Sequence, residues 1–461
     1  MSQTADLAIL HAKLITMDDQ RRIFSDGAVA VRGSRIVAVG RSAEVAATFT
    51  AKETIDAKGG VVQPGFVDCH VHFSQHLGRG IIPDAWPEER EHAHWLPYWL
   101  NLSEEDANAG TMLACLEMVR NGTTTFCDNG GKFRGDAKAA VVNRVGLRGM
   151  ISEVCWDLPP YPSVSVGDTD ACLKRLERLT QALPKNADAR IWAGVSMAGM
   201  GRCTDRLLVE GKRLADRLGV TLDFHQSFGP GDVANYRKQT GGKTAIEHFA
   251  NLGILGTNLQ LVHMIYTEDS EVALLAASRT NVVHCPAAST RVGMGVSKVG
   301  RFPEMVAQGV NVALGSDSGN YSDFFDVARQ AYLASTIHRE ARGVMPAISA
   351  HQALEMATRN GARSLGMLDA IGSLEVGKKA DIVIHSGCRP EWHPGLNVVN
   401  SLVYSAQSAS VDTVMVDGEI ILRGGRFVRL DEEAEYRKID ALAQNLHRRM
   451  GFAIPSPWPL D

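Results

Sequence analysis

Hydrophobic and polar residues follow two different patterns along this chain. Over residues 5–17, 27–40 and 54–65 they alternate with a period of two between turn residues, which is typical of short β-strands. Residues 380–387 and 411–428 repeat this pattern near the other end. Because the termini of a domain often lie close together, we expect the two segments to pair in one small β-sandwich domain.

The middle of the chain, from residue 64 to 371, has a different pattern. Short apolar runs alternate there with segments of helical period, such as residues 103–122 and 204–219. Strands that alternate with helices indicate a parallel sheet, and about eight such units indicate a closed (β/α)8 TIM barrel. After a first strand that ends near residue 72, the runs that we expect to be barrel strands are 123–128, 147–154, 189–197, 220–226, 259–264, 280–286 and 311–319.

These patterns predict an α/β protein with three kinds of segment. Residues 1–63 and 372–430 are expected to form the two parts of the β-sandwich domain, and residues 64–371 the barrel. A chain of 461 residues is long enough for a large domain with a smaller one attached. The last segment, residues 431–461, begins with an amphipathic helix that we expect to pack on the barrel or at a subunit contact.

Composition and charge exclude several classes of protein. A formal net charge of −4 provides no basic face for nucleic acid or an anionic membrane. No apolar stretch approaches the roughly 18 residues of a membrane span, and the N-terminus lacks the pattern of a secretory signal. The 8 cysteines stand singly, without a C-x-x-C pair, as reduced thiols in the cytoplasm do. We therefore expect a cytoplasmic protein with no nucleic-acid or membrane partner, and the C-terminal helix leads us to expect a homo-oligomer.

Metal-binding side chains stand at the ends of the predicted barrel strands. Residues two apart on a strand point to the same face, so both imidazoles of His70-Val71-His72 can bind one ion. A single histidine at a strand end is usually a core residue. Several histidines at strand ends, together with an aspartate at another strand end, indicate a metal site instead. Three imidazoles and one carboxylate suit zinc, nickel or cobalt. The full set is His70, His72, His225, His263, His284 and Asp317.

Longer sequence motifs, beyond these single residues, support a resemblance to a known family. They are PGFVDCHVHFSQHLGRG (64–80), EMVRNGTTTFCD (117–128), HCPAAST (284–290), GSDSG (315–319) and GSLEVGKKADIVI (372–384). With these motifs the chain resembles the amidohydrolase superfamily, in the branch of cytosine- and guanine-deaminase-like enzymes and triazine chlorohydrolases. Within that branch, it is similar to the phenylurea hydrolases and molinate hydrolase in length and in its mononuclear histidine set.

The resemblance implies a role for each side chain in the set. One divalent metal ion per chain, most often zinc, would be bound by His70, His72, His225 and Asp317. His263 would contact the substrate or the activated water, and His284 would polarise the scissile carbonyl or carry a proton. Asp317 would also be the base that accepts the proton of the water. Asp317, His284 and His263 are thus the expected catalytic residues.

One position departs from the resemblance. Ring deaminases of this branch carry His-x-x-Glu after the fifth strand, and that glutamate protonates a ring nitrogen. Here His225 is followed by Gln226, Ser227 and Phe228, and a benzene ring cannot transfer a proton. The loss of the acid argues against deamination of a purine, pyrimidine or pterin ring.

We therefore expect a metal-dependent hydrolase that cleaves the C–N or C–S bond of a small apolar or aryl urea, carbamate or thiocarbamate, as in phenylurea or thiocarbamate herbicides. The expected substrate contacts are Gln75, Trp86, Phe228 and Tyr321, since aromatic side chains at a barrel mouth suit such a small-molecule substrate. Two alternatives stay open. One is an aminohydrolase or chlorohydrolase of a nitrogen heterocycle in which another group replaces the glutamate. The other is a non-catalytic metal-binding scaffold.

Overall fold

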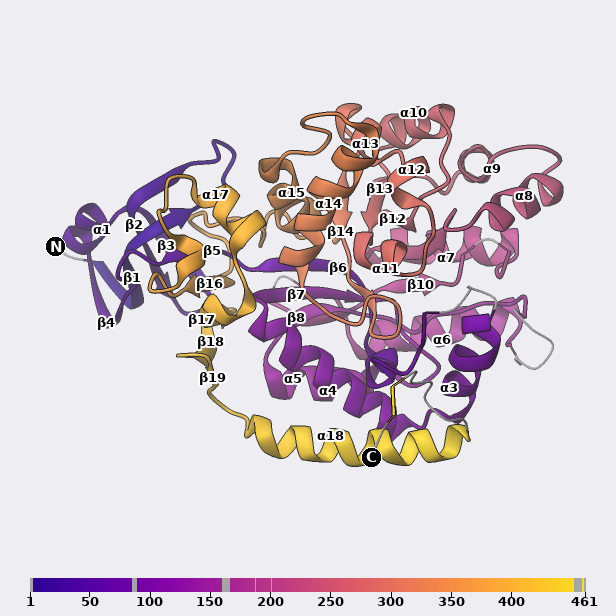
Figure 1. Cartoon of the computed structure of the whole chain (residues 1–461), viewed down its shortest axis with the longest axis horizontal. Coiled ribbons are helices and arrows are strands. Elements are labelled where there is room, and N and C mark those ends of the chain that lie inside the picture. Colours follow the sequence, from indigo (N-terminus) through magenta and orange to yellow (C-terminus); the bar gives the residue numbers. More distant parts are fainter. Residues whose placement is uncertain are drawn as a thin grey trace.

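The structure is a computed structural model that describes residues 3–84, 89–159, 166–186, 188–199, 201–451 and 458–459. Figure 1 shows a barrel surrounded by helices, a smaller β domain on its left, and one long helix below. The predicted architecture, a (β/α)8 barrel with a small β domain from both ends of the chain, is confirmed. The residue boundaries of the domains remain predictions.

Within the described residues, parallel strands occupy eight positions around the barrel. Two positions are split, the fourth into β9 (Ile191–Ala193) and β10 (Val195–Met197), and the eighth into β14 (Val312–Leu314) and β15 (Asp317–Ser318). The barrel closes where β15 pairs with the first strand, β6 (Phe66–His72). The other barrel strands are β7 (Thr123–Asp128), β8 (Arg148–Ile151), β11 (Leu222–Gln226), β12 (Leu259–His263) and β13 (Asn281–His284).

Each of the two split strands has a glycine at its break, because a side chain there would collide with the neighbouring strand. A Cβ on Gly194 would lie 2.3 Å from Sδ of Met150. A Cβ on Gly315 would lie 2.8 Å from the Cβ of His70. Only glycine permits such a close approach. Gly315 therefore lets the eighth strand pass directly against the first strand at His70.

The barrel interior is filled by side chains from alternate positions of the strands. One hydrophobic cluster joins Val67 of β6, Cys127 of β7, Val262 of β12, Val283 of β13 and Ala313 of β14. Because these strands lie all round the barrel, this cluster is its interior. On a regular strand, residues one position along face the surrounding helices. A register shift between Asp68 and Val71 and the positive φ of His263 break this alternation at the ends of β6 and β12.

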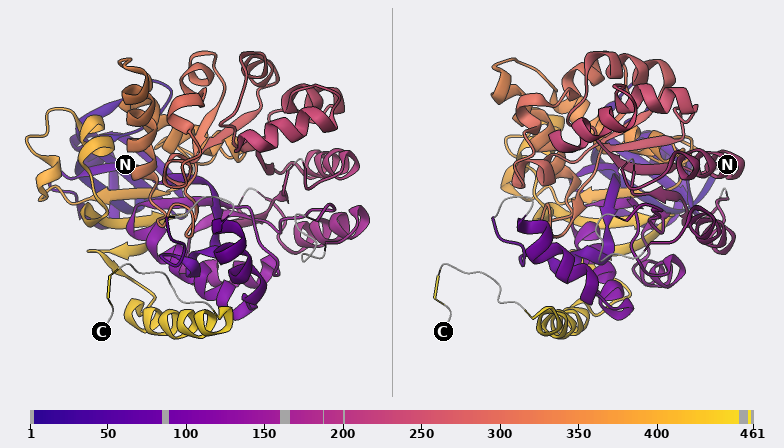
Figure 2. Two further views of the ribbon diagram at one scale, coloured as in Figure 1. Left: turned by 45° about the vertical axis from the view of Figure 1, so that its right-hand side comes forward. Right: turned by 90° about the vertical axis from the view of Figure 1, so that its right-hand side faces the viewer.

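Helices follow most of the strands and cover the outside of the barrel (Figure 2). The predicted helices 103–122 and 204–219 are α4 (Glu104–Arg120) and α7 (Asp205–Leu218). Ser103 caps the first of these through a capping box, and Gly219, with φ of 62°, ends the second. The other main helices are α5 (Gly135–Val145), α6 (Thr169–Ala182), α8 (Pro230–Gln239), α9 (Ala245–Leu252), α10 (Asp269–Ser278), α13 (Phe302–Ala307), α14 (Val327–Arg342), α15 (Ala350–Ala357) and α16 (Arg359–Ser364).

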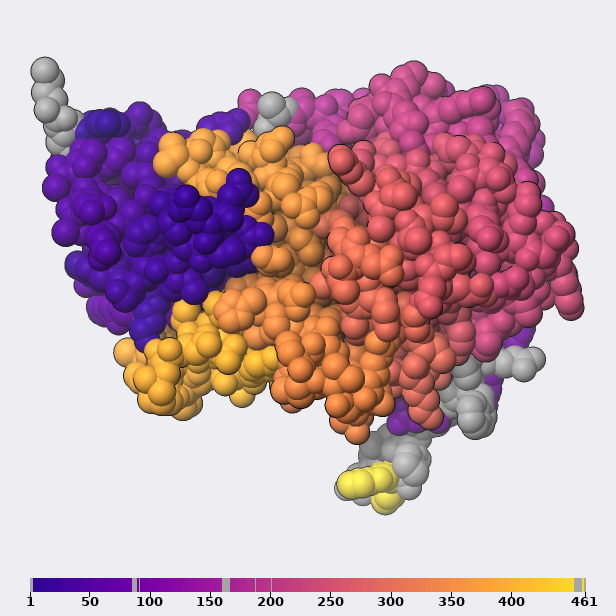
Figure 3. All heavy atoms as spheres, turned by 90° about the horizontal axis from the view of Figure 1, so that it is seen from above, coloured from indigo at the N-terminus to yellow at the C-terminus, as the bar shows by residue number. Residues whose placement is uncertain are grey.

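The β domain joins the two ends of the chain in one sheet. Its described strands are β1 (Gln3–Ile15), β2 (Ile23–Arg32), β3 (Arg35–Arg41), β4 (Phe49–Asp56), β5 (Val61–Pro64), β16 (Ile382–His385), β17 (Val411–Val416), β18 (Glu419–Arg423) and β19 (Arg426–Phe427). The two parts meet where β5 pairs antiparallel with β16. In Figure 3, the indigo atoms of the first part lie directly against the orange atoms of the second.

The C-terminal helix packs on the barrel, which was one of its two predicted positions. α18 (Glu432–Met450) buries Ile439 and Leu446 in the same hydrophobic cluster as residues of α4. At its two ends, Glu432 pairs with Arg120 and Arg449 pairs with Asp106. Among the described helices, none is long and apolar enough to cross a membrane.

A buried ion-pair network joins the barrel to the β domain. Arg148 on β8 is fully buried, and its guanidinium donates to Asp381 Oδ2 at 2.7 Å and to Asp417 Oδ1 at 3.0 Å. Asp381 directly precedes β16, and Asp417 directly follows β17. The two domains are therefore connected by charges that are shielded from water.

We expect Arg148→Met to lower the free energy of unfolding by about 3–5 kcal/mol, because it leaves the buried carboxylate of Asp381 without its cation. The matched control is Arg213→Met, which removes an exposed pair with Glu210 and should cost less than about 1 kcal/mol. Denaturant unfolding of both variants measures the difference. Equal losses in the two variants would show that the buried network contributes no special stability.

Candidate metal centre

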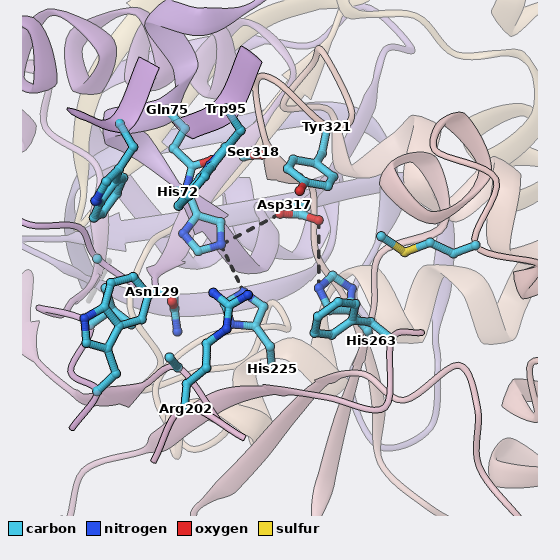
Figure 4. A pocket seen from close by; sticks show the side chains of 17 residues that line it. His72, Gln75, Trp95, Asn129, Arg202, His225, His263, Asp317, Ser318 and Tyr321 are labelled. Atoms are coloured by element: carbon cyan, nitrogen blue, oxygen red, sulfur yellow. Dashed lines mark hydrogen bonds and ion pairs between the residues drawn. The ribbon is translucent and has the colours of Figure 1, made fainter. Parts of the chain in front are cut away.

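Three histidines converge at the carboxyl ends of two barrel strands. His70 and His72 lie at the end of β6, and His225 lies near the end of β11. One ring nitrogen from each lies within 4.8 Å of the other two. The Nε2 atoms of His72 and His225 are 3.1 Å apart. Figure 4 shows His72 and His225 pointing toward the same point of the cavity.

Asp317 adds a carboxylate to this cluster. Its Oδ1 lies 3.9 Å from Nε2 of His70 and 3.8 Å from Nε2 of His72. Asp317 begins β15 directly after the split in the eighth strand, and its φ of 69° is in the left-handed region. The dashed lines of Figure 4 show its carboxylate between the histidines of the first and sixth strands.

The chemistry of these four side chains fits a divalent metal ion. Burial lowers the pKa of His70 far below its usual value and lowers the pKa of His72 to about 4, so both rings are neutral. Both ring nitrogens of His70 are buried without a hydrogen-bond partner. His72 is also hydrogen-bonded to the backbone of Gly130, and this bond fixes the orientation of the imidazole ring. A bound divalent ion would satisfy the lone pairs that now converge without a donor.

His263 lies beside the cluster, where the sequence predicted it. It ends β12 with a φ of 77°, which turns its ring into the cavity. Its Nε2 is 4.0 Å from Oδ2 of Asp317, and its ring stacks on His225 with centroids 5.4 Å apart. This position allows contact with a substrate bound at the cluster.

His284 is not among the residues that line the cavity. The prediction that it contacts the scissile carbonyl of a substrate is therefore corrected. Because Val283 belongs to the barrel interior, the next residue on β13 faces the helices. The His284 ring stacks on Phe302 at 3.7 Å between centroids and lies 5.6 Å from His338. The sequence placed His284 at a strand end correctly but did not show which way its side chain turns.

A cavity of about 150 Å³ opens over the side chains of His72, His225 and Asp317. Of the predicted substrate contacts, Gln75, Phe228 and Tyr321 line it, whereas Trp86 lies outside the described residues. Trp95 and Trp99 stack on one side with centroids 5.4 Å apart. Lining residues that sequence analysis missed include Asn129, Val154, Trp156, Arg202 and Met294. The cavity therefore combines five aromatic side chains, Trp95, Trp99, Trp156, Phe228 and Tyr321, with the polar groups of the cluster.

Asn129 was missed although its sequence position carried a signal. Like Asp317, it is a polar residue at the carboxyl end of a predicted barrel strand. It is fully buried, and its Nδ2 donates to Asp223 Oδ2 at 2.7 Å and to Ser196 Oγ at 3.2 Å. These two acceptors fix the orientation of the amide beside His72 (Figure 4). Trp156 and Met294 had no comparable signal, because both lie in connections after strands.

Phe228 occupies the cavity wall next to the histidines. Its ring centroid is 5.8 Å from that of His263. The two acids nearest in sequence have other roles, since Asp232 accepts from the backbone of Gly229 and Glu247 caps the first turn of α9. Among the described residues that line the cavity, Asp317 is the only carboxylate. The structure therefore offers no acid at the position of the missing glutamate.

Comparison with known families agrees with this geometry. A model described as the amidohydrolase family matches residues 61–421. A second model, described as an imidazolonepropionase-like composite domain of bacteria, matches residues 27–50.

Named relatives align with almost the whole chain. A 5-methylthioadenosine/S-adenosylhomocysteine deaminase from Syntrophobacter fumaroxidans is 31% identical over 446 residues, which cover 96% of this chain and 99% of the relative. A 5'-deoxyadenosine deaminase from Methanosarcina acetivorans is 32% identical over 445 residues, with the same coverage of 96% and 99%. These relatives overturn the expected cleavage of ureas, carbamates or thiocarbamates, and the similarity to phenylurea and molinate hydrolases is not shown.

Solved structures have the same fold. An adenosine deaminase from Xanthomonas campestris with bound zinc has a TM-score of 0.89 at 27% identity, covering 98% of this chain and 99% of that one. An atrazine chlorohydrolase from Arthrobacter aurescens complexed with zinc has a TM-score of 0.88 at 22% identity, covering 95% and 100%. At that lower identity the likeness concerns the fold alone.

Proposed function

This chain belongs to the amidohydrolase family and is a metal-dependent hydrolase of carbon–nitrogen bonds other than peptide bonds, and we propose that it is an aminohydrolase of adenine nucleosides. The observation that carries the proposal is the cluster of three neutral imidazoles and one carboxylate beneath an aromatic cavity. Relatives that match nearly the whole chain and bear deaminase names support the choice of reaction.

We propose one ion per chain, zinc first among the candidates, held by His70, His72, His225 and Asp317. A divalent ion in such a site would lower the pKa of a bound water from its ordinary high value to about 7. The zinc bound in the Xanthomonas campestris adenosine deaminase named above supports this choice of metal. Nickel and cobalt suit the same donor set.

Asp317 is the proposed proton carrier. Its carboxylate lies between His72 and His263, where it can accept a proton on one side and return it on the other. Since Phe228 cannot donate, Asp317 would take the proton of the attacking water and pass it to the heterocycle. The ring carbon gains a bond to oxygen, its bond to the amino nitrogen breaks, and ammonia leaves with the second proton of the water.

The aromatic wall and His263 would position the ring. Trp95, Trp99 and Tyr321 provide flat apolar surfaces against which a purine can stack. His263, whose pKa is lowered by burial to about 3, stays neutral and can exchange a hydrogen bond with the substrate beside Asp317.

The test is product identification with the purified protein. We expect adenosine, 5'-deoxyadenosine or 5'-methylthioadenosine to yield ammonia and the matching inosine-type product in the presence of zinc. A phenylurea and a thiocarbamate serve as comparison substrates and should release no amine or thiol. Turnover of the comparison substrates without any ammonia from the nucleosides would refute the proposed reaction.

Cellular location and partners are also proposals. All 8 cysteines are free and 7 of them are buried, which suits a reducing compartment such as the cytoplasm. We propose a small-molecule substrate as the main partner, no nucleic acid and no membrane, and a homo-oligomer as the assembled state.

A further inference from the structure

A second cavity, of about 390 Å³, adjoins the cavity of the metal centre. The two share the side chains of Trp99, Val154 and Trp156. On the far side of this shared wall, Cys155 and Cys172 both line the second cavity. Cys155 lies in the connection after β8, directly before Trp156, and Cys172 lies in the first turn of α6.

The two thiols contact each other and the shared wall. The thiol of Cys155 donates a hydrogen bond to the sulfur of Cys172. The thiol of Cys172 in turn donates to the backbone carbonyl of Trp156 at 3.3 Å. Cys155 Sγ also lies 3.7 Å from the backbone oxygen of Cys172. Two thiols in contact with each other are the arrangement from which a disulfide can form.

The surroundings make the two sulfurs chemically different. The hydrogen bond with Cys155 is the largest cause that lowers the pKa of Cys172, followed by the backbone of Trp156 and then the charge of Arg175, whereas the hydrogen bond with Cys172 raises the pKa of Cys155. Arg175 lies one turn further along α6 and lines the same cavity. A thiolate beside a cation is the form that reacts with oxidants, and a neighbouring thiol can then resolve the product.

We propose that Cys155 and Cys172 form a reversible oxidation site, closed as a disulfide by a peroxide and reopened by a thiol reductant. The Cys172 thiolate attacks hydrogen peroxide and becomes a sulfenic acid, with release of one water after proton transfer. The Cys155 sulfur then attacks the sulfenic sulfur, a second water leaves, and the sulfur–sulfur bond forms. The two thiols lose two electrons together, and the peroxide gains them.

This site is connected to the metal-centre cavity through Trp156. Oxidation removes the thiol that donates to the Trp156 carbonyl and ties the connection after β8 to α6. The Trp156 ring, whose centroid is 6.2 Å from that of Trp99, forms part of both cavities. The disulfide therefore changes a wall against which the substrate binds, while the metal-binding side chains remain in place. The inference does not depend on which substrate the enzyme hydrolyses.

The experiment uses the full zinc-loaded chain with Cys388→Ser, which removes the exposed thiol. After treatment with hydrogen peroxide, free thiols are alkylated in denaturant and the peptides are mapped by mass spectrometry. We expect one linked peptide pair that contains residues 155 and 172 and that disappears after dithiothreitol. The matched control, Cys172→Ser in the same background, should give no linked pair.

Three results would overturn the proposal. In the first, both cysteines are still fully alkylated after peroxide treatment. In the second, Cys172 is oxidised without a bond to Cys155. In the third, either residue is linked instead to Cys203, whose Sγ lies 3.7 Å from the backbone oxygen of Cys155. A melting curve before and after oxidation shows that the mapped protein is folded, and the peptide map is valid whether or not the control variant folds.

Discussion

Asp317→Asn is expected to lower kcat/KM for the nucleoside substrate by about 1000-fold or more, because an amide can neither accept nor return the proton of the water. Asp317 is buried, and it contacts histidines of the first and sixth strands. The substitution also removes the only negative charge of the proposed metal site. Steady-state kinetics should be measured together with the metal content of the same preparation.

The matched control is Asp323→Asn, six residues along the same segment. Asp323 accepts from the backbone of Gly80 and pairs with Arg291, and it does not line the cavity. This variant should retain activity within a few-fold and bind as much metal as the parent protein. If Asp317→Asn kept parental turnover at full metal content, Asp317 could not be the proton carrier.

Phe228→Glu is expected to raise kcat for adenine nucleosides by about 10- to 100-fold. A positioned acid contributes roughly 100- to 10,000-fold in catalysis, and part of that factor should be regained when a carboxyl group replaces the ring beside His263. The added acid should also introduce a new alkaline limb into the pH profile of kcat, since it must be protonated to donate. The measurement is ammonia release over a range of pH.

Phe228→Gln is the control for size and polarity. Glutamine has nearly the shape of glutamate but carries no transferable proton. A rise in kcat that the two variants share would mean that relief of the apolar wall, and not an acid, limits the reaction. No rise in the glutamate variant, with metal content and melting temperature preserved, would contradict the view that the parent enzyme lacks a proton donor here.

The fold could be predicted because it depends on periodic burial. Alternation at both ends of the chain predicted the β domain, and the strand–helix repeat predicted the barrel. The helix predicted at 103–122 is Glu104–Arg120, since Ser103 and the glycine at 122 are the usual signals of a helix start and end. Such features are local, so one sequence is sufficient to find them.

The site could be predicted only in part, because side-chain direction depends on strand register. His70, His72 and His225 do converge, whereas His284 faces outward because Val283 fills the interior. Trp156 and Arg202 reach the cavity from irregular connections whose path the sequence does not reveal. The reaction was predicted wrongly because Phe228 alone was taken to exclude a ring deaminase, while relatives over the whole chain carry deaminase names.

The seam of the barrel, where β15 meets β6, has a consequence for biosynthesis. His70 and Asp317 come from the first and last barrel strands, and Gly315 allows them to approach. A ribosome must therefore release nearly the entire barrel sequence before all the proposed ligands can meet. Because metal binding to an unfinished chain would lack the final carboxylate, capture of the ion would mark closure of the barrel in the cell.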